Sequence, residues 1–416
     1  MLIRFWISFV RANAPPSMSR DAPACWTVIV TAVPSSSSVW LTRGIVRGTH
    51  DTVKSARSAA ATKAATRKRV FIGVRIPKTG WSVNRCTKCA GMIILKAMQN
   101  TETASVHRMI ASVRDEVRKA FVGSPSALDT ILVGFITGLH VLIEDIPGVG
   151  KTTLARSLAR ASGLDFARIQ FSPDLLPGDV TGMSVWAQDR HDFVFKPGAI
   201  MHQFILADEL NRASARTQSA LLESMQEQSV SVDGTTYPLP QPFFLIATQN
   251  PLQFAGTFRL PEGQLDRFGL SVSFGYPSAD DESRILELME HEYPVDKLQA
   301  VIDADAVVSA RAMTLAVRVD AKIRQFLIAI ADRSRKNPHV RLGMSPRATG
   351  HLLRASQGVA LVNGRGYVIP EDVASIAPAV LRHRLILSPE ARMEEKSSAR
   401  VVDEILSAIP LPTGVA

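Results

Sequence analysis

The sequence predicts an α/β fold, with a three-layer αβα domain built on a parallel sheet and then a smaller domain made only of helices. Three observations support this. An apolar run at 141–143 leads through a glycine-rich loop into a helical pattern. A second apolar run ends in Asp208, 57 residues after Lys151, and Glu209 follows it. From Ser278 onward, apolar residues recur at the spacings of amphipathic helices.

The loop after the first apolar run has the features of a phosphate-binding loop. The run 141–143 has the composition of a buried parallel strand, and Thr153 to Ala161 reads as a helix. Gly148 and Gly150 let the backbone turn so that successive N–H groups point at phosphate oxygens. The helix N-terminus behind them carries about half a positive charge. This order of strand, loop and helix is the context that such a loop requires.

One position departs from the standard pattern G-x-x-x-x-G-K-[S/T], because Asp145 stands where the first glycine is expected. We predict that Lys151 contacts the β- and γ-phosphates of ATP and that Thr152 ligates Mg²⁺. The alternative, a chance glycine loop before a helix, is disfavoured by the downstream motifs. The predicted nucleotide-binding residues are Asp145, Pro147, Gly148, Val149, Gly150, Lys151, Thr152 and Thr153.

Charge divides the 416-residue chain near residue 97. The first 97 residues hold 16 lysines and arginines against two acidic residues, a net charge of +14, whereas the rest holds 32 against 36, a net charge of −4. Three interpretations remain open for the first segment. It is a basic disordered arm for nucleic acid or acidic lipid, a transit peptide, or sequence that is not native coding, with translation starting at Met92 or Met98.

Cysteine content and hydropathy indicate in which cellular compartment the protein is expected. Cys86 and Cys89 supply at most half a zinc site, and we predict no metal there. The chain after residue 97 contains no cysteine, which fits a protein of the reducing cytoplasm. Arg4 interrupts the apolar run that a secretory signal would need, and no stretch approaches the roughly 18 apolar residues of a membrane span. We therefore predict a cytoplasmic protein without a membrane span.

The elements around the loop follow from apolar periodicity. Two helices, over 101–122 and 126–139, are expected to cover the sheet. A strand at 166–171 follows the loop helix, and 183–186 with 193–195 can form a hairpin. The elements expected after these are a helix at 215–227, a hairpin of 229–232 and 235–239 about Asp233-Gly234 with a type I′ turn, and strands at 243–248 and 272–274.

Polar residues at two strand ends complete the predicted nucleotide site. Asp208 is expected to hold Mg²⁺ through water, and Glu209 to orient and deprotonate the attacking water. Asn250 follows the strand at 243–248 and can sense the γ-phosphate by hydrogen bonding. The alternatives are a solvated strand end for the two acids and, for Asn250, a cap of the turn before Pro251.

Two arginines are candidates for the transition-state charge. Arg267 is a candidate arginine finger that acts on the γ-phosphate of a neighbouring subunit. Its alternative is a surface ion pair with Asp266 or Glu262. Arg347, at the start of a helix, could reach from the helical domain to the phosphates.

The boundaries predicted from these patterns are 1–97 for the basic extension, 98–277 for the αβα core and 278–416 for the helical lid. We interpret the basic cluster Arg382-His383-Arg384 as a solvated helix end. Helices of the lid, besides one that Ser278 caps, are expected at about 305–316, 320–336, 346–362, 370–383 and 399–408.

The ordered set of motifs strongly resembles the MoxR family of AAA+ ATPases, over about residues 98–409. Aspartate at position 145 looks like a common form of the loop in that family. The sequence differs slightly from the usual family motifs at 198–201, 255–258 and 261–264, and these differences remove no catalytic group. The motifs that carry the resemblance are 144–153, 168–171, 174–177, 206–213, 218–223, 247–251, 260–262, 264–268, 345–347 and 381–385.

The resemblance implies a homo-oligomeric ring, usually a hexamer, with ATP bound between subunits. Hydrolysis would move the helical lid against the core, and the two hairpins would carry that motion to a client protein. Family members are similar to chaperones, often work with proteins that contain a von Willebrand factor A domain, and mature or insert metal cofactors in client complexes.

Two other functions use the same core. A nucleic-acid motor or transcription activator is supported only by the basic first segment, and the acidic balance of the rest makes nucleic acid an unlikely partner. A scaffold that binds ATP without turnover is disfavoured by the presence of Glu209 and Arg267.

Overall fold

The protein divides into two units, Met1–Thr101 and Glu102–Ala416. Apart from three strands nearer the N-terminus, the residues that the computed structural model describes are 103–189, 191–250, 258–290 and 294–412.

In the first unit the described strands form an antiparallel sheet in the order β1-β2-β3. They are β1 (Arg4–Arg11), β2 (Trp26–Val33) and β3 (Ile45–Gly48). The sequence shows no sustained strand period here, so this sheet was not predicted. Cys86, Cys89, Met92 and Met98 lie outside the described residues, and the interpretation of the segment stays a prediction.

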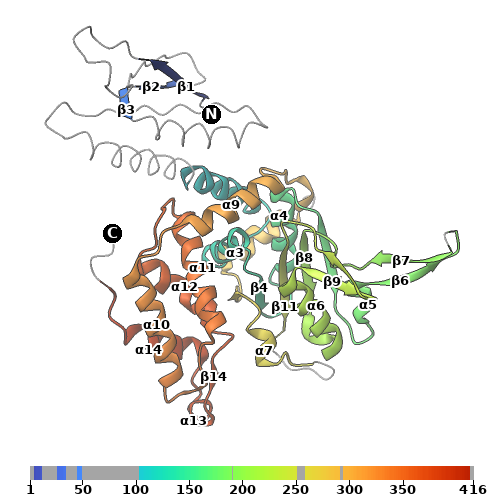
Figure 1. The fold of residues 1–416 in the computed structure, drawn as a ribbon. Helices are drawn as coiled ribbons and strands as arrows, with labels where there is room; N and C mark the ends of the chain where they lie inside the picture. Colours follow the sequence, from blue (N-terminus) through green and yellow to red (C-terminus); the bar gives the residue numbers. More distant parts are fainter. Residues whose placement is uncertain are drawn as a thin grey trace, which may run out of the picture. The chain divides into compact units, whose positions relative to one another are not determined.

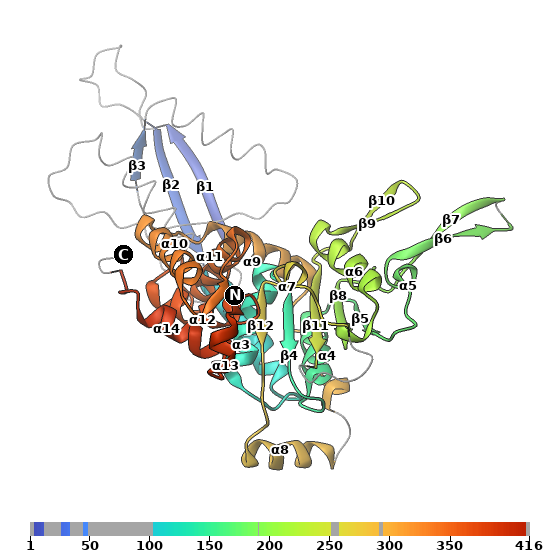
Figure 2. The same ribbon diagram turned by 90° about the horizontal axis from the view of Figure 1, so that it is seen from below.

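The second unit is organised on a five-stranded parallel sheet (Figure 1), whose strand order β12-β4-β11-β8-β5 can be followed in Figure 2. The carboxyl ends of parallel strands meet at one edge, which is where open α/β sheets bind ligands. The polar residues that follow β4, β8 and β11 are therefore brought together. The strands are β4 (Val141–Glu144), β5 (Phe166–Gln170), β8 (Phe204–Asp208), β11 (Phe244–Gln249) and β12 (Leu270–Val272).

Alternate strand residues enter two separate cores, because successive side chains of a strand point to opposite faces. Ile143 belongs to the core shared with α3 (Pro125–Thr137) and α4 (Lys151–Ser162). Leu142 belongs to the core shared with α6 (Ala215–Glu227). The predicted αβα layering is thus confirmed.

Boundaries near the site differ from the predicted ones by a few residues. Within the described residues the first predicted helix, 101–122, is helical over 103–117 and so ends before 122, and α4 starts at Lys151 instead of Thr153. The last strand is Leu270–Val272, whereas 272–274 was expected. The chain leaves the sheet early because the backbone beyond Val272 donates to a carboxylate of the phosphate-binding loop, described below.

Two hairpins project from the sheet on the side of α6 (Figures 1 and 2). In the second, Asp233 and Gly234 have φ of +49° and +79°, as the predicted type I′ turn requires. The short helix α5 (Pro177–Thr181) precedes the first hairpin. The hairpin strands are β6 (Gly182–Ala187) with β7 (Asp192–Pro197), and β9 (Ser229–Val232) with β10 (Thr235–Pro238).

The carboxyl-terminal region is helical, and its longer helices match the predicted ranges closely. A two-stranded sheet of β13 (Val340–Leu342) and β14 (Ile386–Leu387) and the short helix α13 (Pro389–Met393) were not predicted, because such short elements show no period. The helices are α8 (Ala279–Met289), α9 (Ala304–Ala316), α10 (Ala321–Lys336), α11 (Pro346–Val362), α12 (Pro370–Leu381) and α14 (Ser398–Ser407).

These helices are not equally attached to the sheet domain. Helices α9 and α11 contact α3, and α12 contacts β12, so that one continuous core runs through both domains. By contrast, α8 contains no buried residue and stands apart from the other helices in Figure 2. In the described parts of the chain, no helix is long and apolar enough to cross a lipid bilayer.

Candidate functional site

The loop between β4 and α4 has the backbone geometry that phosphate binding needs. Gly148 and Gly150 have φ of +87° and +83°, in the region that favours glycine. Gly150, which has no side chain, occupies the N-cap position of α4. The first N–H groups of α4 therefore face an open position, where the helix dipole also favours an anion.

Lys151 bends back over this loop. Its Nζ donates to the carbonyl oxygen of Asp145 at 2.6 Å. Burial lowers the pKa of the ammonium group, and the carboxylates of Asp145, Asp208 and Glu209 oppose that shift. Because the hydrogen bond of this partly buried ammonium group goes to a neutral carbonyl, a phosphate would add a charged acceptor in direct contact.

The carboxylate of Asp145 binds the segment that follows the last strand of the sheet. Its Oδ2 accepts hydrogen bonds from the backbone N–H groups of Phe274 and Gly275, the latter at 3.0 Å, and from the hydroxyl of Ser273 at 3.3 Å. Its other carboxylate oxygen, Oδ1, accepts from the backbone N–H of Ile146 in the loop at 2.9 Å. The structure thus shows this side chain bound to the segment that leaves the sheet, and its membership of the nucleotide-binding set stays a prediction.

Both carboxylate oxygens of Asp208 have partners. Oδ1 accepts from the hydroxyl of Thr248 at 2.6 Å, and Oδ2 accepts from Nε and Nη2 of Arg168 at 3.0 and 2.7 Å. Arg168 lies on β5, the strand beside β8. The sequence analysis did not predict this ion pair, although the adjacency of the two strand ends in a parallel sheet could have suggested it.

Glu209 stands in a strained backbone conformation, with φ of +57°. Its Oε2 accepts from Nε2 of Gln170 at 3.1 Å and from Nη1 of Arg212 at 3.0 Å, and its N–H donates to the hydroxyl of Thr248 at 2.9 Å. The carboxylate is thus held by side chains on both sides of the strand end. Gln170 and Thr248 are further site residues that the sequence analysis missed.

Asn250 lies at the same edge, after β11. Its carbonyl oxygen accepts from Nδ2 of Asn211 at 3.2 Å. The predicted phosphate-sensing position is thus tied by its backbone to the turn after Glu209.

These groups meet in one cleft of about 310 Å³. It brings together most of the residues predicted from the sequence. Its lining residues are Pro147, Gly148, Gly150, Lys151, Thr152, Thr153, Asp208, Glu209, Thr248 and Asn250.

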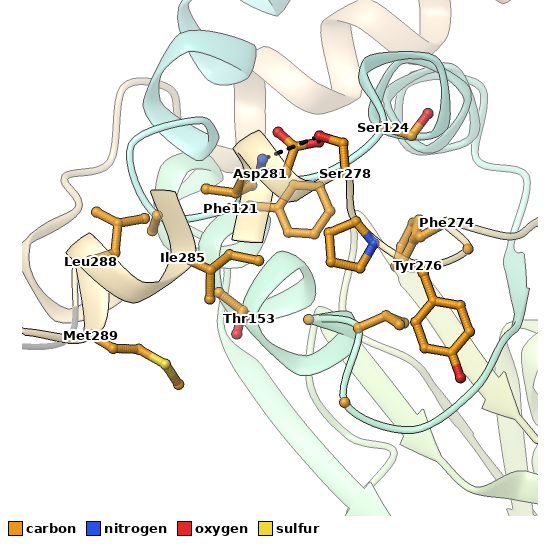
Figure 3. A pocket seen from close by; sticks show the side chains of 18 of the residues that line it. Phe121, Ser124, Thr153, Phe274, Tyr276, Ser278, Asp281, Ile285, Leu288 and Met289 are labelled. Atoms are coloured by element: carbon orange, nitrogen blue, oxygen red, sulfur yellow. Dashed lines mark hydrogen bonds between the residues drawn. The ribbon is translucent and has the colours of Figure 1, made fainter. Parts of the chain in front are cut away.

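A second, more apolar cavity of about 460 Å³ adjoins the cleft (Figure 3). Gly148, Gly150 and Thr153 line both, and Val149 lines this one. Apart from Thr153 on α4, its labelled side chains come from the loop before α3, from the segment after β12 and from α8. They are Phe121, Ser124, Phe274, Tyr276, Ser278, Asp281, Ile285, Leu288 and Met289. Aromatic and aliphatic walls beside a phosphate cleft suit a purine base.

The donor set fits Mg²⁺. The hydroxyl of Thr152 and the carboxylate of Asp208 both line the cleft, and oxygen donors are what this ion prefers. Each carboxylate oxygen has two lone pairs, so Asp208 can accept a metal-bound water while Arg168 and Thr248 stay bound. Thr152 would hold the ion directly and Asp208 through water, as predicted.

The two predicted arginines lie elsewhere. Neither Arg267 nor Arg347 is among the residues lining the cleft. Arg347 has Nη1 4.0 Å from Oδ2 of Asp266 and donates weakly to Oε1 of Gln226 at 3.4 Å. The structure does not place Arg347 at the phosphate cleft of its own subunit; it lies beside the residue that precedes Arg267.

The cluster Arg382-His383-Arg384 is not a solvated helix end, and that interpretation is wrong. His383 and Arg384 are buried. Arg384 forms an ion pair with Asp266 at 2.9 Å, and a ring nitrogen of His383 lies 3.1 Å from the carbonyl oxygen of Phe268. The predicted alternative for Arg267, an ion pair with Asp266 or Glu262, is not seen between these described residues, and Asp266 pairs with Arg384 instead.

Comparisons with known proteins agree with this architecture. Residues 140–270 match the profile of the ATPase family associated with various cellular activities (AAA), and residues 332–405 match the AAA lid domain. A crystal structure of a provisionally assigned ATPase from Cytophaga hutchinsonii superposes with a TM-score of 0.72 at 35% identity, covering 77% of this chain and all of that one.

Curated relatives cover the same region. The chain is 43% identical to the uncharacterized protein YeaC of Bacillus subtilis, over 74% of this chain and 96% of that protein. It is 38% identical to chaperone MoxR1 of Mycobacterium tuberculosis, over 74% of this chain and 84% of that protein.

Proposed function

Because the chain belongs to the MoxR family of AAA+ ATPases, we propose that it hydrolyses ATP to ADP and phosphate, with Mg²⁺, at sites shared between the subunits of a ring. One observation carries this proposal. Lys151 and Glu209 line the nucleotide cleft, whereas Arg267 and Arg347 adjoin Asp266, outside that cleft. A single protomer therefore carries both parts of a hydrolytic site, the cleft residues and the arginines, but in separate places.

Within the cleft, Glu209 acts as the general base. Gln170 and Arg212 hold its carboxylate through Oε2, so that Oε1 can accept a proton from the attacking water. Lys151 leaves the carbonyl of Asp145 and binds the β- and γ-phosphates. Mg²⁺, when held by Thr152 and Asp208, neutralises charge on the phosphate oxygens. Asn250 hydrogen-bonds to the γ-phosphate.

The remaining positive charge comes from the neighbouring subunit. Arg267 acts as the arginine finger, and Arg347 acts with it, since both adjoin Asp266. A nucleotide in this arrangement contacts the cleft of one subunit and the arginine pair of the next. Such a head-to-tail interface closes into a ring when its rotation allows, and the proposed ring is a hexamer.

The hairpins are the proposed client contacts. Trp186 and Phe193 on β6 and β7 are 52% and 65% exposed, and their rings meet edge to face at 5.3 Å. Exposed aromatic side chains are typical of binding surfaces. A chaperone-like role for client complexes, metal-cofactor insertion, a partner with a von Willebrand factor A domain and a cytoplasmic location are proposed from the family resemblance.

The experiment that tests the proposal measures the ATPase rate of the full chain against protein concentration, with Arg267→Ala in parallel. We expect the rate per subunit to rise with concentration as subunits associate. Arg267→Ala should lower the maximal rate by about 10³-fold, since an arginine finger contributes that much or more. ATP binding, measured by titration calorimetry, should remain.

A rate per subunit that is flat with concentration and indifferent to Arg267 would refute the shared site. Glu209→Gln serves as the control for the base, because it should bind ATP and fail to hydrolyse it. A Glu209→Gln protein that turns over at the parent rate would remove the catalytic assignment.

A further inference from the structure

Arg384 follows α12 and lies buried between the helical domain and the sheet domain. Its side chain is only 2% exposed. Its Nε donates to Oδ1 of Asp266 at 2.9 Å, and its terminal nitrogens donate to the carbonyls of Asp266, Phe268 and Gly269. All of these acceptors belong to the short segment that contains Arg267.

The rest of the guanidinium is also bound. Nη1 donates to the carbonyl of Val380, and Nη2 lies 2.7 Å from Nδ1 of His351. Burial lowers the pKa of His351 to about 4, so its imidazole is neutral and can accept this bond at neutral pH. Each of the five N–H groups of Arg384 thus has an acceptor.

Asp266 connects Arg384 to Arg347, the second arginine proposed to act in hydrolysis. The hydroxyl of Ser345 donates to both oxygens of Asp266, at 3.0 and 2.9 Å, and accepts the N–H of Ala348 as the N-cap of α11. Arg347 lies in the first turn of that helix. Asp266 therefore positions Arg267, which follows it directly in the chain. It also positions Arg347, because it binds Ser345, the N-cap of α11.

We propose that Arg384 is a positioning residue for ATP hydrolysis: it holds Asp266 and the backbone of 266–269 so that Arg267 and Arg347 point together at the nucleotide of the neighbouring subunit. This inference rests on the proposed function, because it requires the shared site. Arg384 touches no nucleotide itself, since its guanidinium is enclosed by the contacts above.

The geometry explains why arginine is needed. A lysine would keep the charge, but its single ammonium group has three donors at one point. It cannot span the carboxylate of Asp266 and the carbonyls of Phe268 and Gly269 at once. Arg384→Lys should therefore loosen the finger segment while the ion pair that holds the domains together remains possible.

The first readout separates chemistry from binding. Arg384→Lys should lower kcat by about 10- to 100-fold, since a misplacement near 1 Å costs up to that much, with KM for ATP within about threefold. Arg365→Lys is the matched control. Arg365 pairs with the buried Asp372 inside the helical domain, away from Asp266, and its variant should keep the parent kcat.

The second readout tests whether Arg384→Lys damages the arginine pair or the nucleotide cleft, which lie on opposite sides of the subunit interface. Arg384→Lys subunits are mixed in equal amounts with Glu209→Gln subunits. An intact cleft from the first and an intact arginine pair from the second then meet at some interfaces. Random mixing predicts about one quarter of the parent rate, well above either variant alone.

The outcomes distinguish the two proposals. Arg267→Ala mixed with Glu209→Gln tests the shared site alone, and if this pair gives no recovery, the proposed function fails. If that pair recovers activity and the Arg384→Lys pair does not, Arg384 damages its own cleft and the positioning role is overturned. An Arg384→Lys enzyme with the parent kcat would overturn it as well.

Discussion

At the scale of single residues, Asp145 shows how a departure from a motif acquires a structural reason. Its carboxylate is buried and binds three donors in the segment Ser273–Gly275. This segment leads from the last strand toward α8. A glycine in the standard pattern could not form these bonds, so the aspartate links the phosphate-binding loop to the exit of the sheet.

We expect Asp145→Gly to lower the free energy of unfolding by about 1–3 kcal/mol, because two backbone N–H groups lose their acceptor. Denaturant unfolding measures this loss. ATP affinity should change little, since the loop backbone that faces phosphate keeps its glycines.

Asp145→Asn is the control, because its amide oxygen can still accept one of the bonds and should retain part of the stability. If Asp145→Gly instead loses ATP binding at unchanged stability, the side chain belongs to the nucleotide site after all.

Residues of the cleft were predictable because their chemistry is local in the sequence. A lysine after Gly150 and two acids after an apolar strand are read directly from the chain. Arg384 was not predictable, because a charged residue at a helix end is usually solvated. Its burial depends on Asp266, which lies 118 residues away in the sequence.

At the scale of elements, α8 differs from the other lid helices. It buries none of its residues, although Ile285, Leu288 and Met289 line the apolar cavity beside the loop. A helix with few apolar contacts opens at low free energy. A base that filled this cavity would give these apolar side chains a further packing partner.

We therefore expect the amides of α8 to exchange rapidly with deuterium in the nucleotide-free protein. A non-hydrolysable ATP analogue should slow that exchange by about tenfold or more, equivalent to about 1.4 kcal/mol of local stabilisation. Hydrogen exchange read by mass spectrometry checks this. The buried helix α11 provides the internal control, and equal protection of α8 with and without analogue would contradict the expectation.

Amphipathic periodicity predicted the longer helices of the lid well, because each of them except α8 packs one apolar face on a continuous core. Short elements were missed for the opposite reason. The strands β13 and β14 pair across more than 40 residues of sequence, and a two-residue strand carries no pattern of its own. The early end of β12 depended on Asp145, a contact that no local pattern shows.

At the scale of the whole molecule, buried histidines link folding to pH. Burial lowers the pKa of His140 to about 3, that of His351 to about 4 and that of His383 well below its ordinary value. Unfolding restores an ordinary pKa near 6.5. Between these values the unfolded chain binds more protons than the folded one, so protonation favours unfolding.

Stability should therefore be complete above about pH 6.5 and fall as the pH drops toward 4, by up to about 1.4 kcal/mol per pH unit for each histidine. Denaturant unfolding at a series of pH values measures the slope. His351→Gln removes one titrating group while keeping an acceptor for Arg384, and should reduce the slope by about one proton. Constant stability between pH 7 and 5 would contradict this account.

The stacked rings of Phe195 and Tyr237 have a mechanical consequence. They lie 3.9 Å apart at an interplanar angle of 11°, so they join the hairpin β6–β7 to the hairpin β9–β10. Helix α6 leads almost directly into β9, and its other end begins six residues after Glu209. With 13 residues it spans about 20 Å. If Glu209 is the catalytic base and the hairpins contact a client, as proposed, a shift at Glu209 would move both hairpins together, and each subunit would act on the client through one joint contact.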